Sequence, residues 1–171
     1  DLSLTTGAHL VVRALEDDLD PAQRGDIYLA IIDAMAALHT VDPAAVGLAD
    51  YGKPGGYFER QLKRWSEQYR ASETRPIAAM DELTARLPAR CPADDGSVAL
   101  AHGDFRIDNL MFHPTQPRVI AIVDWELSTL GHPLADLGYF CMALRLPRNP
   151  ALPGLAGLDR AALGIPDEAA L

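Results

Sequence analysis

Two short segments of the sequence bring together residue types that could transfer a phosphoryl group. Residues 102–109 contain a carboxylate, Asp104, and an amide five positions later, Asn109. Residues 122–126 contain a second carboxylate, Asp124. Phosphoryl transfer needs a group that orients the acceptor hydroxyl and takes its proton, and it needs oxygen ligands for the magnesium ion that neutralises the phosphates. One carboxylate, one amide oxygen and a second carboxylate would supply all three.

The stretch between the two segments predicts how they come together. Residues 110–112 and 119–123 are apolar and typical of two short strands, and residues 114–117 between them contain two prolines, as turns often do. Two antiparallel strands joined by a tight turn return the chain to its starting point. We therefore expect a β-hairpin that brings Asp124 back beside Asn109.

The pattern H-G-D-x-x-x-x-N, followed by a hairpin and then I-V-D-W-E, resembles the Brenner-type motif of the aminoglycoside phosphotransferase and choline kinase families. These families are relatives of the protein kinases. On that resemblance, Asp104 corresponds to the catalytic base, and Asn109 and Asp124 correspond to the magnesium ligands. His102 corresponds to the residue that braces the catalytic loop. The resemblance implies ATP as co-substrate and Mg²⁺ as cofactor.

Three further segments extend the resemblance. In G-H-P-L-A-D-L-G, residues 131–138, Asp136 corresponds to an acid that ties down the catalytic loop from behind. L-H-T-V-D, residues 38–42, resembles the end of the linker-proximal helix of these families. G-K-P-G-G-Y, residues 52–57, resembles the branch found fused to, or encoded near, acyl-CoA dehydrogenases. That branch implies hydroxylated acyl compounds as acceptors, and fusion or association with an acyl-CoA dehydrogenase.

Two more polar residues in these segments each allow a functional and a structural interpretation. Arg106 either reaches the transferred phosphate as a cation, or forms a structural ion pair or faces solvent. Glu126 either assists metal binding through a water molecule or holds the loop by a polar contact. Both are candidate phosphate or substrate contacts. Asp108 is interpreted as a loop-stabilising or solvent-facing acid.

A helix that must support these segments is predicted to begin at Asp20. Asp20 can cap it, Pro21 suits its first turn, Gln23 can complete a capping box, and Pro43 ends it. Helical spacing puts the apolar residues of this segment on one face. That face contains Ile27, Ile31, Ala34, Met35 and Leu38.

Three more helices are predicted, over residues 57–69, over residues 76–87 and after Pro133. The first two carry apolar stripes that we interpret as core faces rather than cofactor-binding surfaces. These stripes comprise Phe58, Leu62, Trp65 and Tyr69 in one helix, and Ile77, Met80, Leu83 and Leu87 in the other. The last helix is expected to bury Leu137, Phe140, Cys141 and Leu144.

These elements predict an α+β fold that is mainly α, the C-terminal lobe of a protein kinase-like fold, with helices around a short catalytic β-hairpin. Kinases of this fold also use an N-terminal lobe whose strand lysine contacts the nucleotide phosphates. Only Lys53 and Lys63 are present, and both lie downstream of where that lobe should end. We expect residues 1–19, with a strand at residues 10–12, to be an unassigned N-terminal remnant. Residues 20–171 would be the C-terminal lobe, truncated at both ends.

Composition limits the partners of the protein. A length of 171 residues fits one domain, and a net charge of −9 argues against a nucleic-acid binder, which needs a basic surface. The sequence contains neither an apolar run of membrane-spanning length nor a basic segment followed by an apolar one. The two cysteines form no C-x-x-C pair and no disulfide framework. We expect a cytoplasmic protein without nucleic-acid or membrane partners.

Three functional hypotheses remain at this stage. The motif set favours the catalytic lobe of an ATP-dependent phosphotransferase that acts on a hydroxyl of a small molecule, which the resemblance suggests is a hydroxyacyl compound. The alternative is a non-catalytic binding or interaction module, or an inactive fragment derived from this family, because the lysine that grips the phosphates is not visible. A metal-dependent hydrolase using Asp104 and Asp124 ranks third. An upstream segment with a strand lysine would favour the kinase.

Overall fold

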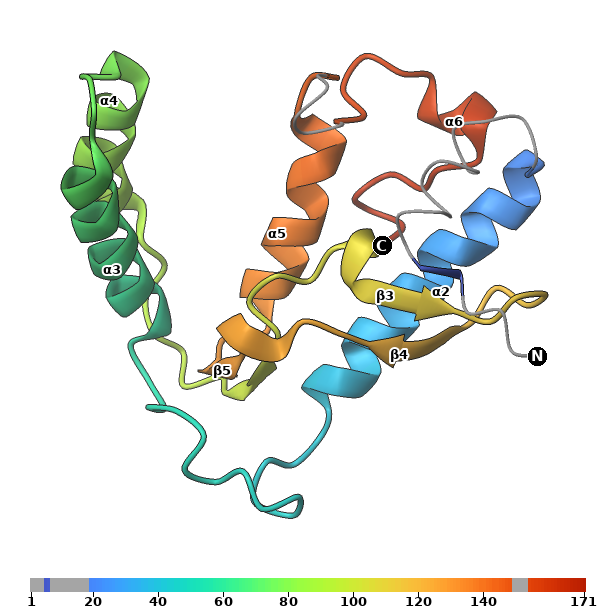
Figure 1. Cartoon of the computed structure of the whole chain (residues 1–171), viewed down its shortest axis with the longest axis horizontal. Helices are drawn as coiled ribbons and strands as arrows, with labels where there is room; N and C mark the ends of the chain where they lie inside the picture. Colours follow the sequence, from blue (N-terminus) through green and yellow to red (C-terminus); the bar gives the residue numbers. More distant parts are fainter. Residues whose placement is uncertain (1–4, 7–18, 149–153) are drawn as a thin grey trace.

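The computed structural model describes residues 5–6, 19–148 and 154–171, so the strand predicted at residues 10–12 lies outside the described part. Figure 1 shows a body, in which the helices α2 and α5 lie near a β-hairpin, and an arm made of α3 and α4. Within the described residues, no helix is both long enough and apolar enough to span a bilayer.

The helix α2 (Pro21–His39) begins where the sequence predicts. The Asp20 carboxylate accepts a hydrogen bond from the Gln23 backbone N–H at 2.9 Å, and the Gln23 side chain accepts one from the Asp20 N–H at 3.1 Å. This completes the predicted capping box and satisfies two donors that a helix start leaves without partners. The buried face of α2 comprises Arg24, Ile27, Ile31, Met35 and Leu38.

The predicted hairpin is confirmed. The strands β3 (Leu110–Phe112) and β4 (Val119–Ile122) pair antiparallel, with Leu110 opposite Ile122 and Met111 opposite Ala121. The short strand β1 (Thr5–Thr6) adds to the free edge of β3. Part of the first 19 residues therefore belongs to the same sheet as the hairpin.

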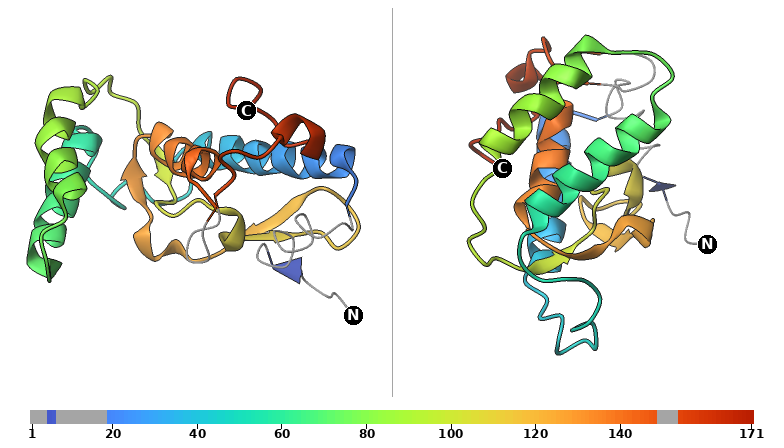
Figure 2. Two further views of the ribbon diagram at one scale, coloured as in Figure 1. Left: turned by 90° about the horizontal axis from the view of Figure 1, so that it is seen from above. Right: turned by 90° about the vertical axis from the view of Figure 1, so that its left-hand side faces the viewer.

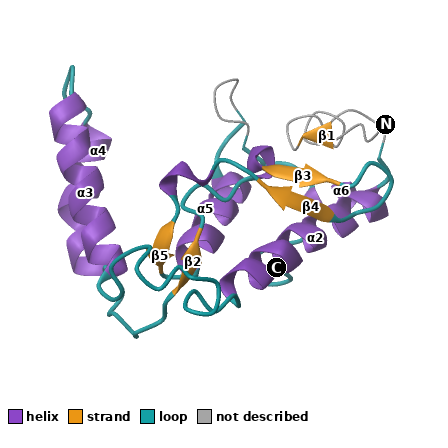
Figure 3. Ribbon diagram, turned by 60° about the horizontal axis from the view of Figure 1, so that its bottom comes forward, coloured by secondary structure: helices purple, strands orange, loops and turns teal. Residues whose placement is uncertain are grey.

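A second sheet, which was not predicted from the sequence, supports the loop at residues 102–109. Its strands β2 (Ala99–Ala101) and β5 (Thr129–Gly131) pair antiparallel. Because β2 leads directly into residues 102–109 and β5 follows residues 122–126, this pairing holds both motif segments at one end of the sheet. Figure 3 shows the two strand pairs as separate units.

The remaining elements complete the body. The helix α5 (Leu134–Arg145) follows Pro133 as predicted, and a short helix, α6 (Arg160–Leu163), contacts α2. Single 3₁₀ turns occupy Leu87–Arg90, Ile107–Asn109 and Trp125–Leu127. The core joins the hairpin and β2 to α2 and α5, and its buried members are Ile27, Ile31, Met35, Leu38, Leu100, Phe105, Leu110, Phe112 and Phe140.

The prediction that the next two helices have core faces is wrong. The helices α3 (Tyr57–Ser72) and α4 (Ala78–Arg86) contain no buried residue, and Trp65 and Leu83 are 47 % and 46 % exposed. Figure 2 shows these helices side by side, apart from the layer that contains α2 and the hairpin. Two helices without a third layer can cover only one side of each other, so their stripes stay partly exposed.

We predict that the body and the arm respond differently to loss of an aliphatic side chain. Ile31 is fully buried, so Ile31→Ala should lower the free energy of unfolding by about 2–5 kcal/mol. The matched change Leu83→Ala on the arm should cost less than about 1 kcal/mol, because that side chain is half exposed. Urea denaturation of both variants measures the difference, and equal losses would contradict it.

Candidate active site

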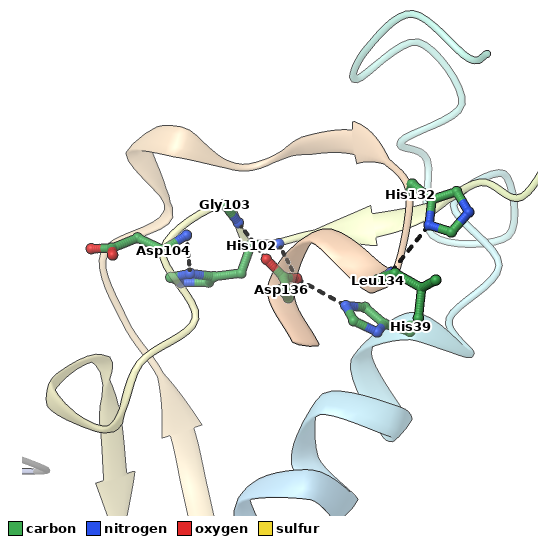
Figure 4. A network of polar contacts seen from close by, with 7 residues as sticks. All are labelled: His39, His102, Gly103, Asp104, His132, Leu134 and Asp136. Atoms are coloured by element: carbon green, nitrogen blue, oxygen red, sulfur yellow. Dashed lines mark hydrogen bonds and ion pairs between the residues drawn. The ribbon is translucent and has the colours of Figure 1, made fainter. Parts of the chain in front are cut away.

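The buried carboxylate of Asp136 holds the start of the loop at residues 102–109, the candidate catalytic loop. Its side chain is fully buried, and its two oxygens accept hydrogen bonds from the backbone N–H groups of His102 and Gly103, each at 2.8 Å. The Nε2 atom of His39, at the end of α2, lies 2.8 Å from the same carboxylate (Figure 4). A buried carboxylate is stable only when its oxygens are hydrogen-bonded. Asp136 therefore joins α5, α2 and the loop at one point.

His102 connects the loop to the end of the hairpin. Its imidazole is buried, its Nε2 lies 3.0 Å from the Val123 carbonyl, and its Nδ1 accepts from the Asp104 backbone N–H at 3.3 Å. Because Nδ1 accepts and Nε2 faces a carbonyl, these contacts require the neutral tautomer with its proton on Nε2. The ring also packs edge-on against Trp125. His102 is thus positioned as a bridge between the two motif segments.

Residue 103 must be a glycine because the backbone passes very close to the Leu127 carbonyl at this point. Its φ is +83°, a left-handed conformation, and a Cβ at this position would lie 2.5 Å from the Leu127 carbonyl oxygen. A side chain would collide with backbone that cannot move without displacing the turn after Asp124. The H-G-D order therefore has a steric reason as well as a chemical one.

Asp104 and Asn109 are in direct contact. The Asn109 Nδ2 donates to both the carbonyl and the carboxylate of Asp104, each at 2.9 Å, across a loop closed by the 3₁₀ turn at residues 107–109. This use of Nδ2 leaves the side-chain oxygen (Oδ1) of Asn109 available to accept from or bind another group. Figure 4 shows the Asp104 carboxylate directed away from the Asp136 anchor. The carboxylate is therefore fixed by the loop and open to an incoming molecule.

Asp124 reaches the same edge through the hairpin. The Val123 N–H donates to the main-chain carbonyl of Asn109 at 2.9 Å, which continues the β3–β4 pairing up to Asp124. Asp124 has φ +68°, and no other non-glycine residue in the described ranges has a positive φ. Such conformations cost energy and persist where the surroundings impose them, often at functional sites. The exposed side chain of Asp124 makes no hydrogen bond or ion pair within the described part of the chain.

The donors at this edge suit a magnesium ion. The side-chain oxygen (Oδ1) of Asn109 and the Asp124 carboxylate are hard oxygen ligands, which magnesium prefers. Residues 5–6, 19–148 and 154–171 contain no group of three or more His, Cys, Asp or Glu side chains able to hold a metal. A magnesium ion here would thus complete its shell with water and phosphate oxygens, as is usual for this ion in phosphoryl transfer.

The two candidate phosphate contacts lie in different surroundings. Arg106 is half exposed and pairs with Asp108 at 2.9 Å, which is the structural ion pair that the sequence left open. Glu126 is exposed, and in the described residues its carboxylate has neither a hydrogen bond nor an ion pair. The structure brings Asp104, Asn109 and the backbone of Asp124 together. Among the described residues, it gives Glu126 no hydrogen bond or ion pair to the loop.

Tyr139 on α5 belongs to the site but was missed in the sequence. Burial raises the pKa of its hydroxyl, and a hydrogen bond to Asp104 together with the charge of that carboxylate raises it further. The pKa of Arg106, whose side chain is hydrogen-bonded to Tyr139, is also raised. Desolvation by burial lowers this pKa, but the negative charges of Asp108 and Asp104 raise it. Tyr139 lies three positions after Asp136, and residues three apart lie on the same face of a helix. This spacing is the sequence signal that could have indicated that Tyr139 is near the loop.

Comparisons with known proteins show the family of this chain. The sequence profile described as the phosphotransferase enzyme family matches residues 3–171. Acyl-CoA dehydrogenase family member 10 of Mus musculus is 46 % identical over 149 residues, which are 86 % of this chain and 14 % of that protein. Acyl-CoA dehydrogenase family member 11 of Gallus gallus is 52 % identical over 71 % of this chain and 16 % of its own length. The chain thus spans roughly one seventh of the length of these relatives.

Solved structures show the same architecture. A Ralstonia eutropha protein provisionally described as an aminoglycoside phosphotransferase superposes with a TM-score of 0.85 and 54 % identity, over 92 % of this chain and 47 % of that one. A type VIII aminoglycoside-3'-phosphotransferase superposes with a TM-score of 0.58 at 20 % identity, over 83 % and 52 % of the two chains, which shows the fold alone. These likenesses confirm the predicted fold class, a mixed, mainly helical lobe of the kinase-like fold.

We predict that replacing the loop anchor destabilises the protein. In Asp136→Asn, the amide must turn a donor toward at least one of the groups that now donate to the carboxylate, which leaves buried donors without partners. The free energy of unfolding should fall by about 2–3 kcal/mol. The matched change Asp81→Asn, at a half-exposed surface pair, should alter it by less than about 1 kcal/mol. Urea denaturation tests both, and an unchanged midpoint for Asp136→Asn would refute the anchoring role.

Proposed function

This chain belongs to the phosphotransferase enzyme family, as its sequence resemblance indicates, and on that basis we propose that residues 20–171 are the catalytic lobe of an ATP-dependent small-molecule kinase. The observation that carries this proposal is the contact between Asn109 and Asp104 within a loop anchored by Asp136. It leaves one oriented carboxylate and one amide oxygen at the same edge as Asp124. Those are the groups that phosphoryl transfer to a hydroxyl requires.

In the proposed mechanism each residue has one task. The Asp104 carboxylate accepts a hydrogen bond from the acceptor hydroxyl, orients it toward the phosphoryl group and takes its proton. Asn109 holds Asp104 through Nδ2, and its side-chain oxygen (Oδ1) would bind the metal together with the Asp124 carboxylate. When bound, Mg²⁺ would neutralise the phosphate charge; the acceptor oxygen bonds to the γ-phosphorus of ATP as the bond to the β–γ bridging oxygen breaks, and ADP leaves. His102 and Asp136 act on the reaction only by fixing the loop.

We propose a hydroxyacyl compound as the acceptor class. Support comes from the G-K-P-G-G-Y segment and from relatives named as acyl-CoA dehydrogenase family members, in which a domain like this chain occupies 14–19 % of the length. A kinase covalently joined to a dehydrogenase would act on a substrate related to that of its partner. We therefore also propose that this chain works fused to, or associated with, an acyl-CoA dehydrogenase.

We predict that Asp104→Asn, tested in the full-length protein that contains this chain, lowers kcat at least about a hundredfold and changes ATP affinity little. A general base acts in the transition state, and contributions of about a hundredfold or more are typical. The control Asp33→Asn replaces an exposed carboxylate on α2 and should keep full activity. Steady-state assays with hydroxyacyl compounds and aminoglycosides provide the measurement. Wild-type turnover in Asp104→Asn would remove this residue from the mechanism.

We predict that Asp124→Ala mainly abolishes the magnesium dependence of ATP binding. A carboxylate between metal and phosphates cannot be replaced by water without loss of charge neutralisation. Calorimetric titration with ATP, with and without Mg²⁺, should show a large magnesium effect in the wild type and little or none in the variant. Glu126→Ala is the informative comparison, since its exposed carboxylate neighbours the same turn. Identical magnesium titrations for wild type and Asp124→Ala would contradict the assignment.

A further inference from the structure

The turn that carries Asp124 is not fixed by burial. Asp124 has a φ of +68°, which is unfavourable for a residue with a side chain, and the 3₁₀ turn Trp125–Leu127 follows it directly. No residue of that 3₁₀ turn is buried. Its own bonds run from the Ser128 N–H to the Trp125 carbonyl, at 3.0 Å, and from the Trp125 Nε1 to the Ile122 carbonyl, at 2.8 Å. An unfavourable conformation persists where the surroundings impose it, so other parts of the chain must support this turn.

Tyr51, in the connection from α2 to α3, supplies one such support. Its hydroxyl lies 2.5 Å from the Oγ of Ser128, a residue 77 positions later, and that Oγ donates to the Trp125 carbonyl, also at 2.5 Å. Because a serine hydroxyl has one proton and Ser128 gives it to Trp125, the Tyr51 hydroxyl is the donor to Ser128. The two bonds form a chain from Tyr51 to the backbone of the residue that follows Asp124.

Gly52 packs against the strand that leaves the same turn. A Cβ on Gly52 would collide with the Thr129 Oγ1 and would lie 2.8 Å from the Leu130 backbone nitrogen. The backbone at residue 52 therefore lies directly against the first two residues of β5. A side chain at this position would displace β5, so the approach requires glycine.

The residues that follow are themselves tied down. Arg60, in the first turn of α3, donates to the carbonyls of Gly55 and of Lys53, the latter at 2.6 Å. The Asp94 carboxylate accepts from the Gly56 N–H at 2.7 Å. Residues 51–56, which include most of the G-K-P-G-G-Y sequence, thus form a segment bound to α3 at one end and to the turn after Asp124 at the other.

The opposite side of the turn meets the candidate catalytic loop. The His102 ring packs edge-on against Trp125, with 4.9 Å between the ring centroids, and Gly103 lies against the Leu127 carbonyl. The turn is therefore held between two supports. One is the loop that carries Asp104, and the other is segment 51–56.

We infer that Tyr51 and Gly52 are positioning residues for the metal, because segment 51–56 holds the Asp124 turn in the geometry that a magnesium ion requires. This inference rests on the proposed function, in which Asp124 binds the metal. Tyr51 touches neither metal nor phosphate and acts only through Ser128. Magnesium demands nearly ideal octahedral geometry, so a small displacement of one ligand weakens its binding.

The full-length protein that contains this chain allows a test without turnover. Mn²⁺, which takes the same oxygen ligands, is the probe, and electron paramagnetic resonance measures its free concentration beside a non-hydrolysable ATP analogue. Tyr51→Phe should raise the Kd of Mn²⁺ about two- to tenfold, as expected for one lost hydrogen bond. Ser128→Ala should raise it at least as much, and the double variant no more than Ser128→Ala alone, because both act through one bond.

Two matched changes serve as controls. The Tyr69 hydroxyl, on the arm, has no hydrogen-bond partner among the described residues, so Tyr69→Phe should leave the Kd of Mn²⁺ unchanged. Gly52→Ala should raise it more than Tyr51→Phe does, whereas Gly138→Ala, where a Cβ meets nothing within 4 Å, should not. Affinity for the analogue in EDTA, measured by calorimetry, should stay the same in Tyr51→Phe, since a positioning role acts only through the metal.

The outcomes separate this inference from the proposed function. Asp124→Ala is the reference, and it should weaken Mn²⁺ binding strongly. If it does so while Tyr51→Phe and Ser128→Ala bind Mn²⁺ like the wild type, the inference is overturned and the metal assignment stands. Additive effects in the double variant, or an equal loss of affinity for the analogue in EDTA, would also overturn it. Wild-type Mn²⁺ binding by Asp124→Ala would remove the metal site from the proposed function, and this inference with it.

Discussion

The burial of one carboxylate, that of Asp136, is the constraint on which the candidate site depends. A fully buried carboxylate must have its oxygens hydrogen-bonded, and Asp136 obtains this from the backbone of the candidate catalytic loop and from His39. Those donors come from different parts of the chain. The same interaction therefore fixes the loop to α5 and closes α5 against the end of α2.

The rest of the loop follows from this anchor. With Gly103 held at a positive φ against the Leu127 carbonyl, the chain turns so that His102 reaches Val123 and Asp104 points outward. Asn109 then closes the loop by donating to Asp104. Hydrogen bonds rather than bulky side chains set the positions of these groups, which is appropriate for a reaction that depends mainly on positioning and charge.

The body has a continuous buried core, whereas the arm does not. The core is continuous and apolar between α2, the hairpin, β2 and α5. The arm of α3 and α4 has amphipathic helices but no buried residue, so within the described chain its apolar stripes stay partly exposed. On α2, by contrast, the cation Arg24 is buried, and its terminal nitrogens donate to the carbonyls of Leu163 and Leu19.

The sequence by itself determined the local features: the capping box of α2, the hairpin, the helix after Pro133 and the order of Asp104, Asn109 and Asp124 along the chain. Caps, turns and periodicity depend on neighbouring residues, so they can be read without a fold. Only the tertiary structure decided that the stripes of α3 and α4 stay outside the core, that β5 pairs with β2, and that Tyr139 meets Asp104. The contact between His39 and Asp136 joins residues 97 positions apart. Such features depend on which faces meet in space, and periodicity shows that a face is apolar without showing what covers it.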